Sequence, residues 1–226
     1  MFISRKKKSN LTRNKEFLEP YELILIVCEG SETEPNYFNA LIQAEKLSST
    51  NISVTGDCGS DPVSVVNHAI DEYNKRENDS NSERKYDLVY CLIDRDEHGN
   101  FDAALNKIYQ LNKNKGKEVV IPIVSYPCFE YWYICHFEST RKAFLRTGNK
   151  SPGMICENHL NALWKIQFKS KYSKTDPKNY KLLEKLQSNA ISISKINLKD
   201  ALGISTLNPS TQVHELVLKL INLKRK

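Results

Sequence analysis

The chain has 226 residues, of which 40% are hydrophobic, and this length is enough to bury the core of one domain. Its 33 lysine and arginine residues, against 27 aspartate and glutamate residues, give a net charge of +6. No run approaches the roughly 18 uncharged apolar residues of a membrane-spanning helix, and the N-terminus lacks the apolar segment of a signal peptide. Composition therefore excludes a membrane-spanning protein, and we expect a soluble, cytoplasmic one.

Basic residues concentrate in two regions. Residues 1–16 carry six basic side chains and one acid, and residues 165–185 carry seven lysines interleaved with aromatic residues. Both regions suit the phosphate backbone of nucleic acid, although basic runs are also common on solvated helices that bind nothing. In the second region, we expect five lysines to contact nucleic acid: Lys165, Lys169, Lys171, Lys174 and Lys178.

Motifs of several other chemistries are absent. The six cysteines are scattered, and no two of them form the CxxC pair that zinc ribbons use. We expect these cysteines to be reduced and to pack as small hydrophobic side chains. The sequence contains no GxSxG or HExxH motif and no P-loop ending in GKS/T, so ATP hydrolysis by this chain is not expected.

The first part of the chain begins with an apolar strand. Residues 22–28 form a continuous run of β-prone residues that is too short for a helix and ends at Glu29. A helix is predicted over residues 33–42, because a small polar residue and an early proline suit a first turn. A short strand over residues 52–55 and a helix over residues 63–73 follow, joined by a turn that contains glycine and proline.

The same alternation continues further along the chain. A second long apolar strand is predicted over residues 86–93, and a polar turn, residues 94–100, ends it. A helix over residues 101–111 leads to a strand over residues 119–124 and then to an aromatic segment, residues 127–137. Strands that alternate with helices form βαβ units, and we therefore expect an α/β fold with a parallel four-stranded sheet flanked by helices.

The last third of the chain is predicted to be mainly helical, because strand signals fade from about residue 139. Residues 208–211, with the sequence Asn-Pro-Ser-Thr, are expected to cap an amphipathic helix that extends to about residue 221. We predict three parts: a basic N-terminal arm (1–20), an α/β core (21–138) and a helical C-terminal region packed on the core (139–226).

Acidic side chains follow two of the predicted strands at the point where each strand ends. Glu29 follows the first strand; Asp94 and Asp96, which the period-two geometry of a strand points to the same side, follow the third. Ligands of open α/β sheets bind at the carboxyl ends of the strands, and clustered carboxylates select Mg²⁺ or Mn²⁺. Glu34 and Glu130 could join as further metal ligands. We therefore expect a metal site of five acids, in which Glu29, Asp94 and Asp96 are catalytic.

Each of these acids also has a structural alternative. Residues 94–96 could form an ordinary turn that caps a helix, and Glu34 could favour a helix N-terminus through the helix dipole. Glu130 could be a surface acid on an aromatic helix. The combination at two strand ends favours a metal site, which would activate water and stabilise charge during phosphodiester hydrolysis. Glu29 could alternatively act as a general acid or base.

Four blocks of sequence together resemble the RloB family. They span nearly the whole chain in the family's order: residues 26–38 (IVCEGSETEPNYF), 92–96 (LIDRD), 126–137 (YPCFEYWYICHF) and 208–211 (NPST). The blocks are specific together, whereas each alone would be a weak signal. The third block departs from the pattern at Tyr133, where an aliphatic residue is more usual.

This resemblance implies a fold and a site. The RloB family is similar to the Toprim proteins and to the overcoming-lysogenization-defect nucleases, in which a glutamate after the first strand and a DxD after a later strand bind Mg²⁺. The residues that match these acids are Glu29, Asp94 and Asp96, whereas Glu34 and Glu130 match acids of the RloB pattern itself. The resemblance thus implies a Toprim-like sheet and a Mg²⁺- or Mn²⁺-dependent hydrolase.

The resemblance also implies partners. RloB-type proteins are found beside restriction-modification and abortive-infection genes, commonly with an ABC-type ATPase. We therefore expect an endonuclease of RNA, tRNA being one candidate, or of DNA, which acts as an antiphage effector under the control of a separate ATPase subunit. A homo-oligomer is left open. Topoisomerases and primases share the Toprim fold, but 226 residues leave no room for their additional domains. The alternative hypothesis is a non-catalytic module that binds nucleic acid or the ATPase.

Overall fold

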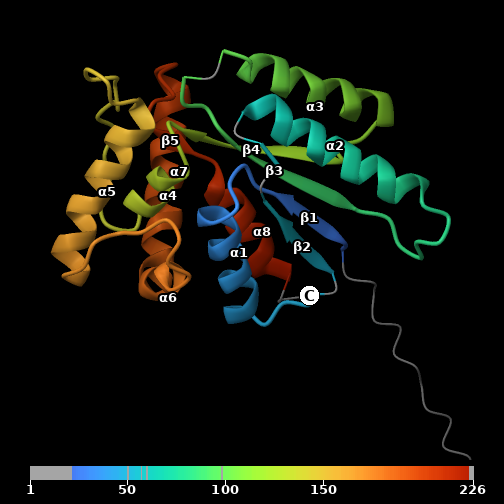
Figure 1. The fold of residues 1–226 in the computed structure, drawn as a ribbon, viewed down its shortest axis with the longest axis horizontal. Helices are drawn as coiled ribbons and strands as arrows, with labels where there is room; N and C mark the ends of the chain where they lie inside the picture. Colours follow the sequence, from blue (N-terminus) through green and yellow to red (C-terminus); the bar gives the residue numbers. More distant parts are fainter. Residues whose placement is uncertain (1–21, 50, 57, 60, 98, 224–226) are drawn as a thin grey trace, which may run out of the picture.

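The computed structural model describes residues 22–49, 51–56, 58–59, 61–97 and 99–223 (Figure 1). The predicted basic arm, residues 1–20, lies outside the described residues. The elements in chain order are β1 (Ile24–Val27), α1 (Thr33–Ala44), β2 (Ile52–Thr55), α2 (Pro62–Asn78), β3 (Leu88–Asp94), α3 (Phe101–Lys115), β4 (Val120–Tyr126), α4 (Glu130–Ile134), α5 (Pro152–Phe168), α6 (Asn179–Leu183), η1 (Glu184–Leu186), α7 (Gln187–Gly203), β5 (Ser210–Thr211) and α8 (Val213–Leu223). Within these ranges, no helix is both long enough and apolar enough to cross a membrane.

The sheet has five strands in the order β2-β1-β3-β4-β5. The four longer strands are parallel to their neighbours, as the alternation of strands and helices predicted. The fifth strand is antiparallel to β4, so the expected number of four strands is wrong. The structure is therefore an α/β fold with a five-stranded, mostly parallel sheet that helices flank.

The additional strand comes from the segment that was expected to cap the last helix. Ser210 and Thr211 pair with Tyr126 and Ser125 of β4, and the hydroxyl groups of Ser125 and Thr211 lie 2.8 Å apart. Helix α8 begins only at Val213, whose amide donates to the Thr211 hydroxyl at 3.2 Å. Two residues are too few to show a period of two in the sequence, and the strand forms because the edge of β4 offers it backbone partners.

Helices cover both faces of the sheet. Alternate residues of β1 point to opposite faces: Ile24 and Ile26 pack in the cluster formed with α1, α4, α5 and α8, and Leu25 and Val27 pack in the cluster formed with α2 and α3. In Figure 1, α2 and α3 lie on one side of the strands, and α1 and α8 lie on the other. The helices of the last third of the chain thus share a hydrophobic core with the sheet.

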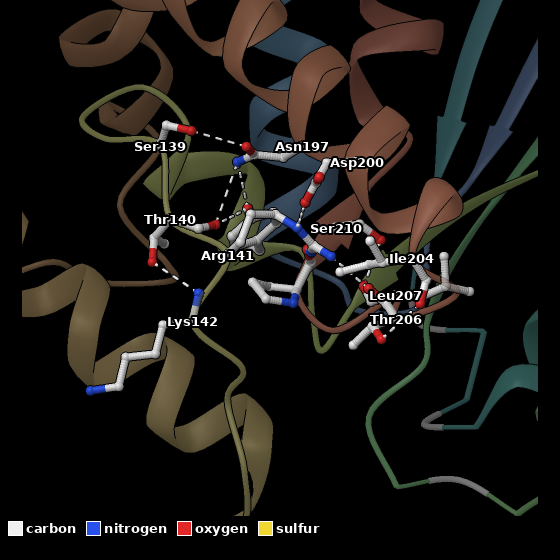
Figure 2. A network of polar contacts seen from close by, with 12 residues as sticks. Ser139, Thr140, Arg141, Lys142, Asn197, Asp200, Ile204, Thr206, Leu207 and Ser210 are labelled. Carbon is white, nitrogen blue, oxygen red and sulfur yellow. Dashed lines mark hydrogen bonds and ion pairs between the residues drawn. The ribbon is translucent and has the colours of Figure 1, made fainter.

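A second set of contacts holds the chain after α4 against α7 (Figure 2). The Arg141 guanidinium donates to Asp200 Oδ2 at 3.1 Å, to the Thr206 carbonyl oxygen at 2.6 Å and to the Pro209 carbonyl oxygen. Beside it, Asn197 is 2% exposed and donates to the Tyr131 hydroxyl at 2.8 Å. We call these residues and their hydrogen-bond partners the Arg141 cluster. It fixes the path of the chain into β5.

Candidate acidic site at the carboxyl edge of the sheet

Four carboxylates meet at the carboxyl edge of the parallel strands. Glu29 follows β1, Glu34 lies in the first turn of α1, Asp94 ends β3 and Glu130 begins α4. All four line one open cavity of about 690 Å³, which we call the acidic pocket. The other residues that line it are Gly30, Ser31, Glu32, Thr33, Gly59, Phe129, Lys174 and Thr175. The structure thus brings together four of the five predicted acids.

The register of the strands places two of these acids. Val27 of β1 pairs with Cys91 of β3 in parallel, so the carboxyl ends of both strands face the same edge. Glu29 lies two residues beyond Val27, and Asp94 still pairs with Ser125 of β4. This arrangement is the one that open parallel sheets use for ligand sites.

A close backbone contact holds the loop that carries Glu29. A Cβ atom at Gly56, just after β2, would overlap the Gly30 carbonyl oxygen and would lie 2.9 Å from Pro35 Cγ. Gly30 itself packs against an acid, because a Cβ atom there would lie 3.4 Å from Glu34 Oε2. Glycine at position 56 therefore permits the approach that sets the position of the Glu29 loop.

Burial and mutual repulsion raise the pKa of two pocket carboxyl groups. Burial is the main cause for Asp94, and the carboxylates of Glu34, Glu29 and Glu130 add to it, so its pKa lies well above the usual value. Burial, followed by Glu130 and then Glu29, raises the pKa of Glu34 to about 7. The pocket therefore concentrates negative charge, which is the electrostatic condition for binding a cation or a proton.

One lysine lies in the same pocket. Lys174 Nζ is 3.0 Å from Glu130 Oε1 and 3.3 Å from Glu157 Oε2 of α5. Burial opposes the charge on this ammonium group, but Glu130 and Glu157 outweigh burial and raise its pKa above the usual value. Lys174 was predicted to contact nucleic acid as part of a basic run. The structure places its ammonium group against the pocket acids, and its contact with nucleic acid stays a prediction.

Asp96 is placed differently from the other predicted acids. It is not among the residues that line the acidic pocket. Its φ of 20° takes the chain out of the extended conformation, and its amide donates to the Pro127 carbonyl oxygen at 2.9 Å. The Asp96 carboxylate approaches the start of α5, where Oδ2 would lie 3.3 Å from a Cβ atom at Gly153. Its Oδ1 is buried and has no hydrogen-bond partner among the described residues.

The donor atoms suit a hard divalent cation, but their arrangement does not close around one. Carboxylate oxygens are the ligands that Mg²⁺ and Mn²⁺ prefer. Within the ranges that the structure describes, however, no three His, Cys, Asp or Glu side chains are arranged so that they could hold one metal ion. The chemistry of the pocket therefore fits the expected metal, whereas the present side-chain positions do not form a finished site.

The remaining predicted lysines lie on the surface. Lys165, Lys169, Lys171 and Lys178 are exposed, and Lys169 also donates to the Ile166 carbonyl oxygen at 3.0 Å, near the end of α5. The role of Lys174 in the pocket was missed by sequence reasoning, because its partner Glu130 lies far away along the chain. The sequence does place a tyrosine, Tyr172, two residues before Lys174. An aromatic residue within a basic run is equally typical of a nucleic-acid-binding surface, so this tyrosine did not indicate that the segment turns toward the pocket.

The fold and the site define the class of this protein: an α/β protein with an acidic pocket at the carboxyl edge of a mostly parallel sheet. A family model described as RloB-like protein matches residues 24–220. The chain therefore belongs to the RloB-like family, as the sequence blocks predicted. Comparison with curated proteins and with solved structures gives no match.

Proposed function

We propose that this chain is a Mg²⁺- or Mn²⁺-dependent endonuclease of Toprim type that hydrolyses phosphodiester bonds in RNA or DNA. The observation that carries the proposal is that Glu29, Glu34, Asp94 and Glu130 line one open pocket at the carboxyl edge of the sheet. They come from the loop after β1, the start of α1, the end of β3 and the start of α4. Like charges at one buried site destabilise a fold unless a ligand compensates them, and such groups are typical of functional sites.

Within this proposal, Glu29, Glu34 and Asp94 would hold the cation. Asp96 would join them through a change of side-chain position, because its buried Oδ1 needs a partner. A bound divalent cation supplies charge stabilisation and acidifies bound water, which is the chemistry that phosphodiester hydrolysis requires. The exposed lysines of α5 and the following segment would contact the substrate backbone away from the reacting phosphate.

The test is cleavage by the purified full chain. Labelled tRNA, other RNA and duplex and single-stranded DNA are incubated with Mg²⁺, with Mn²⁺ or with a chelator. We expect cutting only with a divalent cation, and we expect Asp94→Ala combined with Asp96→Ala to reduce the rate by about 100-fold or more. The matched control is Asp71→Ala, an exposed acid on α2, which should cut like the wild type. If the double variant still cleaves nucleic acid at the wild-type rate, the proposal is wrong.

We also propose an effector role in antiphage abortive infection together with an ABC-type ATPase subunit, which is what the resemblance to RloB-type proteins implies. Expression of the chain with and without an ABC-type ATPase encoded beside it, followed by sequencing of cleaved RNA and DNA ends, tests this role. We expect new ends that depend on Asp94 and that change in amount with the ATPase. Ends that are the same in both cases would argue against control by that subunit.

A second candidate function is a non-catalytic module that binds nucleic acid or the ATPase. The observation that favours it is that no three potential ligands of the described chain are arranged around one ion. This candidate predicts salt-sensitive binding of nucleic acid without turnover. It also predicts no binding of Mg²⁺ or Mn²⁺ at millimolar concentration, so a divalent-ion titration separates the two candidates.

A further inference from the structure

Lys174 enters the acidic pocket from the segment between α5 and α6, and that segment is anchored. Tyr172, two residues before the lysine, is 3% exposed, and its ring packs against Trp164 and Tyr133 at centroid distances of 5.3 and 5.9 Å. On the other side, Asn179 Nδ2 donates to the Ser173 carbonyl oxygen at 2.8 Å. The backbone just before Lys174 is therefore held by the packing of Tyr172 and by the hydrogen bond from Asn179 to Ser173, unlike that of a lysine on a solvated helix.

The partners of Lys174 differ from those of a surface ion pair. Glu130 is 3% exposed, and the Tyr172 hydroxyl donates to the same Oε1 atom, at 3.4 Å, that accepts from Lys174. Glu157 adds a second carboxylate from α5. Glu130 is therefore a buried carboxylate whose hydrogen-bonding needs are met by two donors. An ion pair between two exposed side chains, by comparison, contributes little to stability. Half of the Lys174 side chain remains exposed, so its ammonium group can be replaced without opening the core.

We infer that Lys174 occupies a cation position on the Glu130 side of the acidic pocket, so that Glu130 is a partner of the lysine and not a ligand of a divalent ion. The inference rests on the proposed metal site and removes Glu130 from its expected ligands. It divides the pocket into one side, with Glu29, Glu34 and Asp94, that is open to a divalent cation, and another side that carries a tethered ammonium group. Lys174 is thus a positioning residue for Glu130 and limits how many divalent ions the pocket accepts.

Removal of the tethered charge should create an additional divalent site. Lys174→Met keeps most of the length of the side chain but leaves Glu130 and Glu157 without their cation, and a divalent ion is then the natural replacement. We expect Lys174→Met to bind one more Mn²⁺ per chain than the wild type, measured by isothermal titration calorimetry and by electron paramagnetic resonance of free Mn²⁺. Lys174→Arg keeps the charge and should retain the wild-type number of ions.

The double variant Glu130→Gln with Lys174→Met separates the inference from simple electrostatics. It removes both members of a compensated pair, so the number of ions should return to that of the wild type and the affinity should change by less than about threefold. It also leaves no buried unpaired charge, so the comparison survives if Lys174→Met alone fails to fold. The matched control is Lys178→Met, an exposed lysine of the same segment, which should not alter the number of ions.

Two results would overturn the inference while the proposed metal site stands. One is wild-type binding with no additional ion in Lys174→Met. The other is an affinity of the double variant that is about tenfold weaker or worse than that of the wild type, because Glu130 would then be a ligand. If neither the wild type nor Lys174→Met binds Mn²⁺ or Mg²⁺ at millimolar concentration, the proposed metal site itself fails, and the inference fails with it.

Discussion

The acidic pocket and the Arg141 cluster are both polar groups of side chains, but they differ in how donors and acceptors are matched. In the Arg141 cluster, one guanidinium faces two carbonyl oxygens and a carboxylate, and Asn197 is hydrogen-bonded through both ends of its amide. Among the described residues that line the acidic pocket, five are acidic (Glu29, Glu32, Glu34, Asp94 and Glu130) and one, Lys174, carries an ammonium group. The acceptors of the Arg141 cluster thus have hydrogen-bond donors, whereas the acidic pocket has more negative than positive side chains.

This difference separates a structural role from a ligand-binding role. A polar network whose members all have partners specifies one conformation and needs nothing from outside. A group of acids that raise each other's pKa lowers the stability of the empty protein, and a ligand that brings positive charge relieves this cost. Changes in the Arg141 cluster should therefore reduce stability, whereas removal of charge from the pocket should increase it in the absence of metal.

The largest expected effect on stability is that of Arg141→Ala. The variant leaves the Thr206 and Pro209 carbonyl oxygens without their donor, and the ion pair with Asp200 contributes less because Asp200 is half exposed. We expect the free energy of unfolding to fall by about 2 to 4 kcal/mol, measured by guanidinium denaturation. Lys142→Ala, an exposed neighbour on the same segment, is the control and should change it by less than about 0.5 kcal/mol. Equal effects of the two variants would argue against the structural role.

A smaller loss is expected from Gly56→Ala, which tests the link between the backbone and the pocket. Its methyl group would overlap the Gly30 carbonyl oxygen, so the Glu29 loop must move. We expect unfolding free energy to fall by about 1 to 3 kcal/mol and Mn²⁺ affinity to fall with it. Gly203→Ala, where an added Cβ atom meets nothing within 4 Å, is the control for stability and for metal affinity. A normal affinity in Gly56→Ala would show that the loop does not need this contact.

The strand ends that carry Glu29 and Asp94 could be predicted, because long apolar runs followed by acids are strong local signals. The fifth strand could not be predicted, because Ser210 and Thr211 are too short a segment to show a pattern. The orientation of Asp96 also escaped prediction. The period-two rule applies only while the chain is extended, and the φ of 20° at Asp96 ends that regime.

The contact between Lys174 and Glu130 could not be predicted from the sequence, for a different reason. It depends on the path of the segment between α5 and α6, which the packing of Tyr172 against the aromatic residues of α4 and α5 determines. Charge patterning along a sequence identifies a basic run but not which member turns inward. Local signals therefore located the edge of the sheet, whereas the charge balance of the pocket depends on contacts between distant segments.

A gain in stability is expected from Glu34→Gln in the absence of metal. The folded-state pKa of Glu34 is raised from 4.5 to about 7, so the folded protein holds its proton to a higher pH than the unfolded chain does. Stability is therefore lost as the pH rises from about 4.5 through about 7, and the loss is complete above that range. We expect the variant to gain about 1 to 2 kcal/mol at pH 8 and almost nothing at pH 4, in denaturation experiments with a chelator.

The control for this pH dependence is Glu118→Gln, an exposed acid before β4, which should shift stability equally at both pH values. The sign of the effect distinguishes the two kinds of polar group, because removal of one member of a satisfied pair leaves its partner unpaired and lowers stability. A Glu34→Gln variant that is less stable than the wild type at pH 8 would mean that the carboxylate is compensated in the folded protein. The acidic pocket would then resemble the Arg141 cluster.

The smallest effect on stability is expected where the side chains are exposed. Lys171→Gln combined with Lys178→Gln should change unfolding free energy by less than about 0.5 kcal/mol, because both residues are on the surface. If these lysines contact nucleic acid, the slope of log affinity against log salt concentration should fall by about 1.5 to 2. Fluorescence anisotropy with labelled RNA and DNA measures this slope.

A matched pair of lysines on the other side of the sheet decides whether the effect is local. Lys113 and Lys117 are exposed at and just beyond the end of α3, which packs on the opposite face from α5. Their double replacement by glutamine removes the same charge, so a general loss of attraction would reduce the salt slope equally. A reduction confined to Lys171 and Lys178 places the nucleic acid on the side from which Lys174 enters the pocket, because phosphate contacts act through short-range release of counterions. If the two double variants reduce the salt slope equally, the attraction is general, and the lysines near the acidic pocket do not form a specific nucleic-acid surface.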